Sequence, residues 1–263
     1  VNPPEKFVLI DLNPIPTDVA IHNYTDEDLV ILGDNTISQY YGEKINFTVS
    51  YFIDGKPNSL ITGAKLNYYW DYGGDTGITE DPIHQGFYSF EIQTDNAPNV
   101  GKYAIYINVA LENYTFNTIV GFLKIESRPT LINSTGIDET SELLRITTDL
   151  NMSDRYLFNF TYRENIGDKE VINDTTLNSF TWECTTSNQY GEGKLNFLPD
   201  GRFQLDFDTE NREVGLYVLL VTVAKPNYEQ RQVMITLSIE KRLMDFNLAG
   251  DFEGLKIEKY KGD

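Results

Sequence analysis

VGKYAIYINVALENY at residues 100–114 returns as VGLYVLLVTVAKPNY at residues 214–228, an offset of 114, and this repeat decides the fold. Other segments recur at nearly the same distance: residues 86–96 match 201–211 at 115, and residues 45–51 match 158–164 at 113. Offsets that vary by a few residues are typical of loop-length changes between two copies of one domain. The sequence therefore predicts two domains, at residues 14–128 and 129–242.

The two ends of the chain resemble pieces of further repeats. Residues 1–13 read like the end of one copy running into the next, so we interpret them as a last strand or a leader. Residues 243–263 read like the opening of a further repeat or a tail. We therefore expect a slice of a longer array, with ordered extensions as the alternative. A terminal strand without its own domain could also pair with another copy and build a filament.

Apolar and polar residues alternate along the segments between the turns. In residues 102–110, Tyr103, Ile105 and Ile107 point to one side, and residues 44–52, 87–94 and 203–207 follow the same pattern. A period of two predicts antiparallel strands with one buried face. About seven such strands in each copy are typical of a β-sandwich, and no stretch keeps a helical period. The predicted fold class is all-β.

Gly-x-Tyr opens a long alternating strand in each copy, at residues 101–103 and 215–217. In immunoglobulin-like sandwiches a tyrosine at this place, here Tyr103 and Tyr217, forms a corner by bonding to the main chain just upstream. Trp70 and Trp182 recur at an offset of 112, where a core tryptophan would fill the sandwich. On these motifs and the Asn-Phe-Thr strand, residues 16–242 resemble the tandem immunoglobulin-like repeats of prokaryotic, particularly archaeal, cell-surface proteins.

The resemblance implies two tandem immunoglobulin-like antiparallel β-sandwiches without a disulfide. Antibody-type domains carry a bridging cysteine two residues after the corner tyrosine, whereas Ile105 and Leu219 stand there in this chain. Cys184 is the single cysteine, so no intrachain disulfide and no cysteine-based metal cluster can form. Because Cys184 follows Trp182 by two residues, we expect its thiol to be buried and inert.

Charge excludes several classes of partner. The 40 acidic residues against 21 basic ones give a formal charge of −19, which excludes a nucleic-acid binder that works by neutralising phosphates. The same charge disfavours docking on anionic lipid. No apolar run approaches the roughly 20 residues that a membrane helix needs, so direct membrane insertion is not expected from this segment.

Catalytic and cofactor chemistry finds little support in the sequence. The chain has two histidines, His22 and His84, and neither recurs in the other copy. Carboxylates are abundant, but nothing selects a pair for acid–base work. We therefore predict a protein that is not an enzyme and has no cofactor.

Calcium is the one metal that the sequence suggests. The loop at residues 71–81 combines glycines with the carboxylates of Asp71, Asp75, Glu80 and Asp81, and oxygen ligands on a tightly wrapping loop suit Ca²⁺. The spacing is not that of an EF-hand, and the second copy lacks the loop. A solvated acidic loop is the alternative interpretation.

Seven sequons exceed the roughly three expected from composition, which favours an exported chain with surface glycans. They lie at Asn23, Asn46, Asn113, Asn133, Asn151, Asn159 and Asn173. Asn46 and Asn159 occupy the same repeat position on the polar side of one strand. Abundant Asn and Thr offer the weaker explanation.

Two functional hypotheses remain open. The first is a non-catalytic extracellular structural or adhesive protein, whose partners are other copies of itself, neighbouring repeats, cell-surface proteins or glycans. The second is a carbohydrate-binding or enzyme-accessory module, which predicts an aromatic platform or cleft in only one copy. The tyrosines and phenylalanines at residues 40–41, 68–72, 114 and 116 exceed what alternation can bury, so exposed aromatic side chains are expected.

Overall fold

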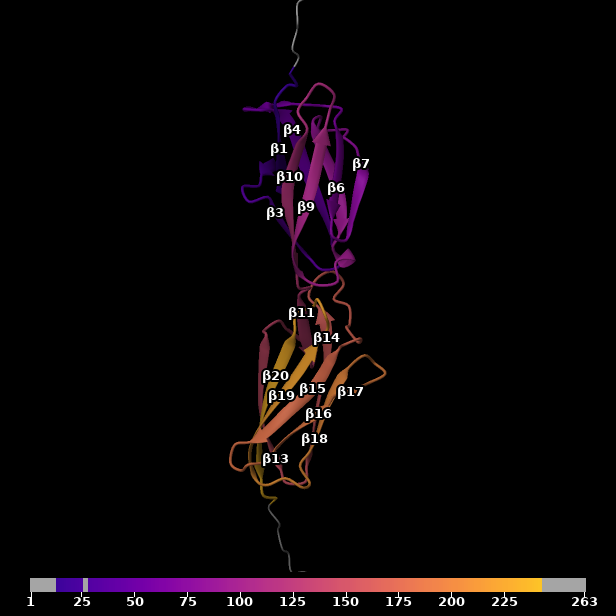
Figure 1. Cartoon of the computed structure of the whole chain (residues 1–263). Helices are drawn as coiled ribbons and strands as arrows, with labels where there is room; N and C mark the ends of the chain where they lie inside the picture. Colours follow the sequence, from indigo (N-terminus) through magenta and orange to yellow (C-terminus); the bar gives the residue numbers. More distant parts are fainter. Residues whose placement is uncertain (1–12, 26–27, 243–263) are drawn as a thin grey trace, which may run out of the picture. The chain divides into compact units, whose positions relative to one another are not determined.

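The computed structural model describes residues 13–25 and 28–242 (Figure 1). The interpretations of residues 1–12 and 243–263 as repeat ends lie outside the described residues. The chain divides into two compact units, which we describe one at a time. In the described part the one helical segment is a 3-10 turn, η1 (Thr94–Asn96). Everything else that is regular is strand, as the alternating pattern predicts.

The first sandwich consists of two five-stranded sheets. One sheet has the order β2 (Asp28–Ile31), β1 (Thr17–Thr25), β4 (Lys44–Ile53), β5 (Lys56–Leu60), and β8 (Phe87–Gln93) also pairs with β4. The other has the order β3 (Thr36–Tyr40), β10 (Asn117–Glu126), β9 (Gly101–Ala110), β6 (Lys65–Trp70), β7 (Gly73–Ile78).

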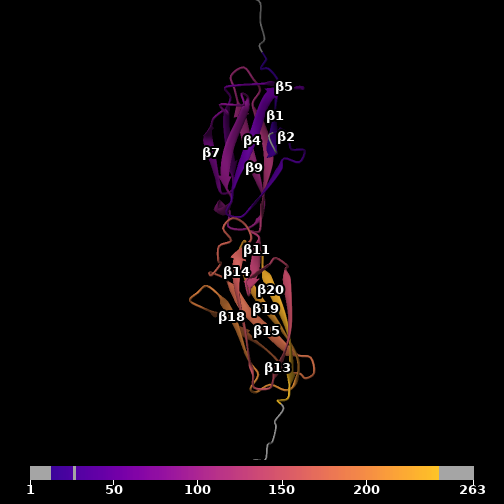
Figure 2. The ribbon, with the colours of Figure 1, turned by 180° about the vertical axis from the view of Figure 1, so that it is seen from behind.

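The second sandwich repeats this arrangement (Figure 2). Its first sheet has the order β12 (Ile137–Glu139), β11 (Thr130–Ser134), β14 (Arg155–Glu164), β18 (Phe203–Asp208), β17 (Asn196–Phe197). Its other sheet has the order β13 (Leu143–Asn151), β20 (Arg231–Glu240), β19 (Gly215–Ala224), β15 (Leu177–Cys184), β16 (Tyr190–Lys194). The fold is thus two tandem immunoglobulin-like β-sandwiches.

One strand pair in each sandwich is parallel, which refines the expectation of antiparallel sheets. β3 pairs in parallel with β10, and β13 pairs in parallel with β20. The chain passes from one sheet to the other between Ile31 and Thr36, so β3 does not form a hairpin with its new neighbour. A parallel pair requires such a crossover, and alternation within a strand does not reveal its direction.

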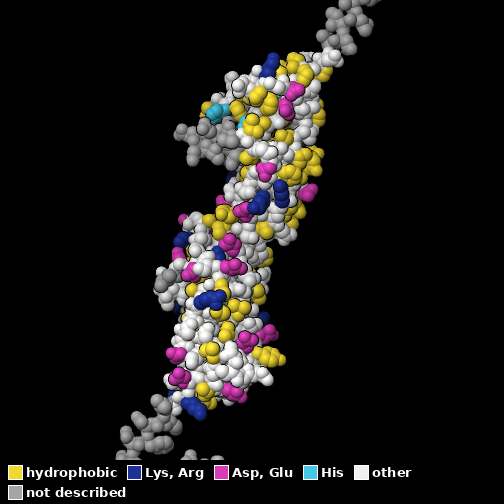
Figure 3. Space-filling model, turned by 90° about the vertical axis from the view of Figure 1, so that its left-hand side faces the viewer, with side chains coloured by type: hydrophobic (Ala, Val, Ile, Leu, Met, Phe, Trp, Pro, Cys, Tyr) yellow, Lys and Arg dark blue, Asp and Glu magenta, His cyan; other side chains and the backbone are white. Residues whose placement is uncertain are grey.

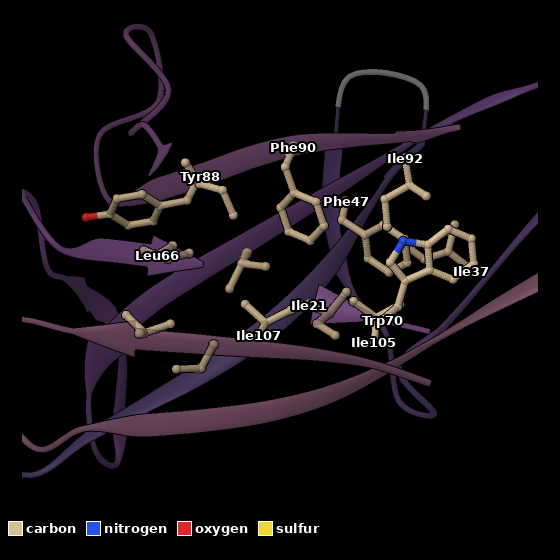
Figure 4. Packing of buried hydrophobic residues seen from close by; sticks show 14 of the residues in the cluster. Ile21, Ile37, Phe47, Leu66, Trp70, Tyr88, Phe90, Ile92, Ile105 and Ile107 are labelled. Atoms are coloured by element: carbon tan, nitrogen blue, oxygen red, sulfur yellow. The ribbon is translucent and has the colours of Figure 1, made fainter. Parts of the chain in front are cut away.

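The core of the first sandwich lies between its sheets (Figure 4). Ile21 and Phe47 project from one sheet, Ile105 and Ile107 from the other, and all four side chains are fully buried. Trp70 packs at one end of this core, near Ile37 and Ile105 (Figure 4). The period of two places Phe47, Ile105 and Ile107 on the inner side of their strands, which is why the sequence pattern located these three correctly.

Candidate binding faces

Both corner tyrosines bond to the main chain four residues upstream. The Tyr103 hydroxyl donates to the carbonyl oxygen of Asn99 at 2.6 Å, and the Tyr217 hydroxyl donates to that of Glu213 at 3.0 Å. The two differ in burial, because Tyr217 is fully buried and Tyr103 is half-buried. Burial raises the pKa of Tyr217 to about 12. These tyrosines anchor the start of β9 and β19 and are structural.

The two tryptophans occupy different environments. Trp70 is buried and meets the Tyr103 ring edge-on at 5.8 Å. Trp182 is only half-buried, and the Arg212 guanidinium carbon lies 3.9 Å from the centre of its ring. Gly191 makes room for this ring, since a Cβ there would lie 2.8 Å from it. Sequence comparison gave no hint of this difference, because it depends on the neighbouring strand.

The carboxylates of the calcium candidate loop bond to the protein's own backbone. Glu80 accepts from the amide of Gly63 at 2.9 Å and from that of Gly86 at 2.5 Å. Asp81 accepts from two amides in its own turn, which lower the pKa of its carboxyl. Asp75 accepts from the amide two residues on, at 3.1 Å. No bond of Asp71 to this loop is seen.

Among the residues that the structure describes, no three His, Cys, Asp or Glu side chains form a group that could hold a metal ion. The carboxylates of the loop at residues 71–81 are therefore not gathered into one such group. Their bonds to amide N–H groups are those of turn-forming side chains.

Sequon asparagines differ in exposure. Four are exposed on the surface: Asn46, Asn113, Asn151 and Asn173. Two are half-buried and hydrogen-bonded: Asn133 donates to Asp138 at 2.7 Å, and Asn159 accepts from Gln204 at 2.9 Å. The side chain of Asn23 lies outside the described residues. Access to a glycan-transferring enzyme therefore differs between Asn46 and Asn159. The strand pairing also shows that the two are not equivalent, because Asn46 lies opposite Glu91 whereas Asn159 lies opposite Gln204, two residues away in the repeat.

Cys184 is 4% exposed, and its sulfur lies 3.2 Å from the Thr186 hydroxyl. Burial raises the pKa of this thiol, but hydrogen bonding, the contact with Thr186 included, outweighs it and brings the pKa to about 7. Burial shields the thiol from solutes, so access limits its chemistry.

The outward side chains of β3, β6, β9 and β10 form a surface that we call face 1. At its centre the rings of Tyr69 and Tyr106 stack 5.0 Å apart, and they are 51% and 38% exposed. Phe122 lies on the next strand, with the Lys102 ammonium 4.4 Å from its ring centre. The sequence suggested the exposure of Tyr69. Tyr106 was not singled out, although the alternation of residues 102–110 places it on the outward side of its strand.

Polar groups flank the tyrosine pair on face 1. The Asn108 side-chain amide donates to Asn67 at 2.9 Å, and the Thr118 hydroxyl donates to Asn108 at 2.7 Å. These three side chains form one row across β6, β9 and β10, because their positions pair directly in the sheet. Face 1 therefore combines an exposed aromatic pair with a fixed set of hydrogen-bonding groups.

The corresponding sheet of the second sandwich carries face 2, the outward side chains of β13, β15, β16, β19 and β20. A hollow of about 710 Å³ lies on it, lined in part by Val218, Leu220 and Met234. Tyr190 stands at its side and is 81% exposed. Glu183 and Glu192 supply its charge. Figure 3 shows hydrophobic side chains at the surface of both units, between charged ones.

Comparisons with known proteins found similarity to solved structures alone. No family model matches the sequence, and no curated protein matches it. The chain is similar to the two-domain IG1+IG2 structure of DIP-gamma, at 10% identity and a TM-score of 0.28, over 79% of this chain and 94% of that one. It is also similar to the adhesin InvE of Yersinia pseudotuberculosis, at 11% identity and a TM-score of 0.34, over 84% of this chain and 58% of that one.

Likeness at this level carries no argument, so the class of the protein rests on its own strands. Sheet order, the crossover to a parallel pair and the corner tyrosines define tandem immunoglobulin-like domains. In the described part of the chain no helix is long and apolar enough to span a membrane.

Proposed function

We propose that this chain is a non-catalytic structural or adhesive protein of the cell surface that binds macromolecules through faces 1 and 2. The observation that carries the proposal is the group of large apolar side chains, exposed or half-buried, on the outward side of the same sheet in both sandwiches. Soluble proteins rarely leave contiguous apolar surface exposed unless a partner covers it. Tyrosine is also among the residues that contribute most to binding energy at interfaces.

Further features support an extracellular setting and a repeat array. The four exposed sequon asparagines fit a glycosylated surface, and the acidic charge fits a crowded layer of mutually repelling molecules. The resemblance to prokaryotic, particularly archaeal, surface repeats belongs to this proposal. So does the division into domains at residues 14–128 and 129–242, with further repeats on either side.

Antibody labelling of the cells that produce the chain tests its location. Labelling of intact cells is expected, and labelling only after permeabilisation would overturn a surface role. Adhesion is tested with beads that carry the purified chain, offered to the same cells. Beads that carry the variant Tyr69→Ala, Tyr106→Ala, Tyr190→Ala should adhere less, whereas equal adhesion by both bead types would refute binding through these faces.

Carbohydrate binding is the second candidate, and the tyrosine pair of face 1 favours it. Tyr69 and Tyr106 expose aromatic surface beside the Asn67–Asn108–Thr118 row, and sugars are bound by such combinations of stacking and hydrogen bonds. The repeat-equivalent positions in the second sandwich are Thr181 and Leu220, so this pair occurs in one copy only. A glycan array should show a signal that Tyr106→Ala removes and Tyr190→Ala keeps, and an empty array would reject this candidate.

A further inference from the structure

We propose that face 1 of one chain docks on face 2 of a second copy of the same chain. This proposal rests on the proposed adhesive role and names its partner. Within their own sandwiches, the two faces have opposite charges and matching apolar centres.

Face 1 is basic although the whole chain has a formal charge of −19. Its outward charged residues are three lysines, Lys65, Lys102 and Lys124, against the single acid Glu126. The Glu126 carboxylate is paired with Lys124 at 2.6 Å. β7 adds no outward charge, because Asp75 lies opposite Tyr68, whose ring stacks on Phe90 in the interior.

Two of these lysines oppose each other directly. Lys102 of β9 and Lys124 of β10 are cross-strand partners. Like charges at directly opposite positions destabilise a sheet. A partner that brings carboxylates to this place would relieve the repulsion.

Face 2 has the opposite charge. Its outward acids are Asp149, Glu183, Glu192 and Glu240, against the two basic residues Arg145 and Lys194. Glu183 and Glu192 lie on neighbouring strands at diagonal positions, because Thr181 pairs with Glu192 and Glu183 with Tyr190. Neither carboxylate has an ion-pair partner among the described residues, so face 2 carries the acidic pair that face 1 lacks.

The apolar centres also match. Face 1 offers Tyr69, Tyr106 and Phe122, and face 2 offers the hollow bounded by Val218, Leu220 and Met234. With strands 4.8 Å apart and 3.3 Å per residue, the strands of face 1 cover roughly 500 Å² and those of face 2 roughly 650 Å². The smaller face limits the contact to a total burial of about 1,000 Å², the size of weak and transient complexes. A weak contact of this kind gains strength when many copies stand on one surface.

Pairing of unlike faces distinguishes this arrangement from simple symmetric association. Face 1 against face 1 would set lysines against lysines, and face 2 against face 2 would set glutamates against glutamates. Juxtaposed like charges suppress such contacts, whereas complementary charges fix the partner and its register. The second copy is therefore the occupant that the chain's own charges select.

Sedimentation of the purified chain over a range from about 1 μM to 1 mM gives the first test. We expect concentration-dependent association that weakens as salt is added, since exposed charges are screened. A chain that stays monomeric throughout this range overturns the proposal.

Two charge-reversal variants give the decisive test. The first carries Lys102→Glu and Lys124→Glu on face 1, and the second carries Glu183→Lys and Glu192→Lys on face 2. Each variant alone should associate at least about tenfold more weakly than the native chain, because its two faces now have the same sign. An equimolar mixture should regain association, because each variant then offers the other a complementary face.

A matched control separates the effect of the faces from that of net charge. Lys56→Glu with Lys241→Glu changes the charge as much as the face 1 variant, at exposed positions outside both faces, and should leave association unchanged. Far-ultraviolet circular dichroism checks that every variant is folded. Association of either face variant at the native level, or a mixture that fails to associate, overturns the pairing of face 1 with face 2.

These experiments distinguish failure of the pairing between face 1 and face 2 from failure of the proposed adhesive role. If the chain is monomeric but its beads still adhere to cells through Tyr69, Tyr106 and Tyr190, the adhesive role stands and the partner is a different molecule. If the chain associates but antibody labels only permeabilised cells, the pairing stands and the surface role is wrong.

Discussion

Replacing Tyr217 by phenylalanine is expected to destabilise the second sandwich by about 1–3 kcal/mol, the usual cost of leaving a buried polar group without its partner. The Tyr217 side chain is 0% exposed, its hydroxyl donates to Glu213 O at 3.0 Å, and Gln189 Oε1 lies 3.0 Å from the same oxygen. Phenylalanine retains the ring packing and removes only the hydroxyl. The main-chain carbonyl of Glu213 then loses its donor, and the burial of the site hinders water from replacing it.

The other corner provides the control. The Tyr103 hydroxyl donates to Asn99 O at 2.6 Å, but Tyr103 is half-buried. Water can therefore satisfy the freed carbonyl, and Tyr103→Phe should cost no more than about 1 kcal/mol. The two substitutions are chemically identical, so their difference measures burial.

Urea unfolding measures both costs. For a domain of this size the dependence on urea is about 1–2 kcal/mol per molar, so a loss of 2 kcal/mol lowers the midpoint by about 1–2 M. Amide hydrogen exchange of peptides from each sandwich identifies the one that is destabilised. A midpoint shift for Tyr217→Phe that is no larger than for Tyr103→Phe would refute the reasoning.

Three other expectations follow from the same structure. Burial raises the pKa of Tyr162 and of Tyr217 to about 12, above the unfolded value of 10, so the stability they contribute is full below pH 10 and is lost as pH rises towards 12. In Tyr162→Phe the free energy of unfolding should therefore fall less steeply over this pH range. Gly193→Ala should cost about 1–3 kcal/mol, because its Cβ would lie 2.5 Å from the Phe180 ring, whereas Gly33→Ala, with open space around it, should change the melting midpoint little. In a glycosylating host, peptide mass spectrometry should find sugar on the four exposed sequon asparagines and not on the two half-buried ones, and sugar on Asn159 would contradict the importance of access.

The sequence by itself determined the strands, their buried sides and the repeat. Alternation in residues 102–110 and 215–224 placed Ile105, Ile107, Leu219 and Val221 in the cores, where all four are fully buried. Alternation identifies the buried side because successive side chains of a strand point to opposite faces of the sheet, independently of the neighbouring strands. Gly-x-Tyr likewise located the two corners, because the bonded carbonyl lies only four residues away.

Tertiary structure decided everything that depends on the neighbouring strand. The match of residues 45–51 with 158–164 aligned Tyr51 with Glu164, yet Tyr51 and Tyr162 bond alike: Tyr51 donates to Thr115 O at 3.0 Å and Tyr162 to Glu229 O at 2.6 Å. A tyrosine shifted by two residues along a strand stays on the same side of the sheet. Tyr51 and Tyr162 therefore make the same bond, although the sequence alignment does not pair them. The parallel direction of β3 and β13, the stacking of Tyr69 on Tyr106 and the opposite charges of the two faces also join residues far apart in the chain. Only the pairing of strands brings them together, because periodicity fixes the side on which a residue lies and not the residue beside it.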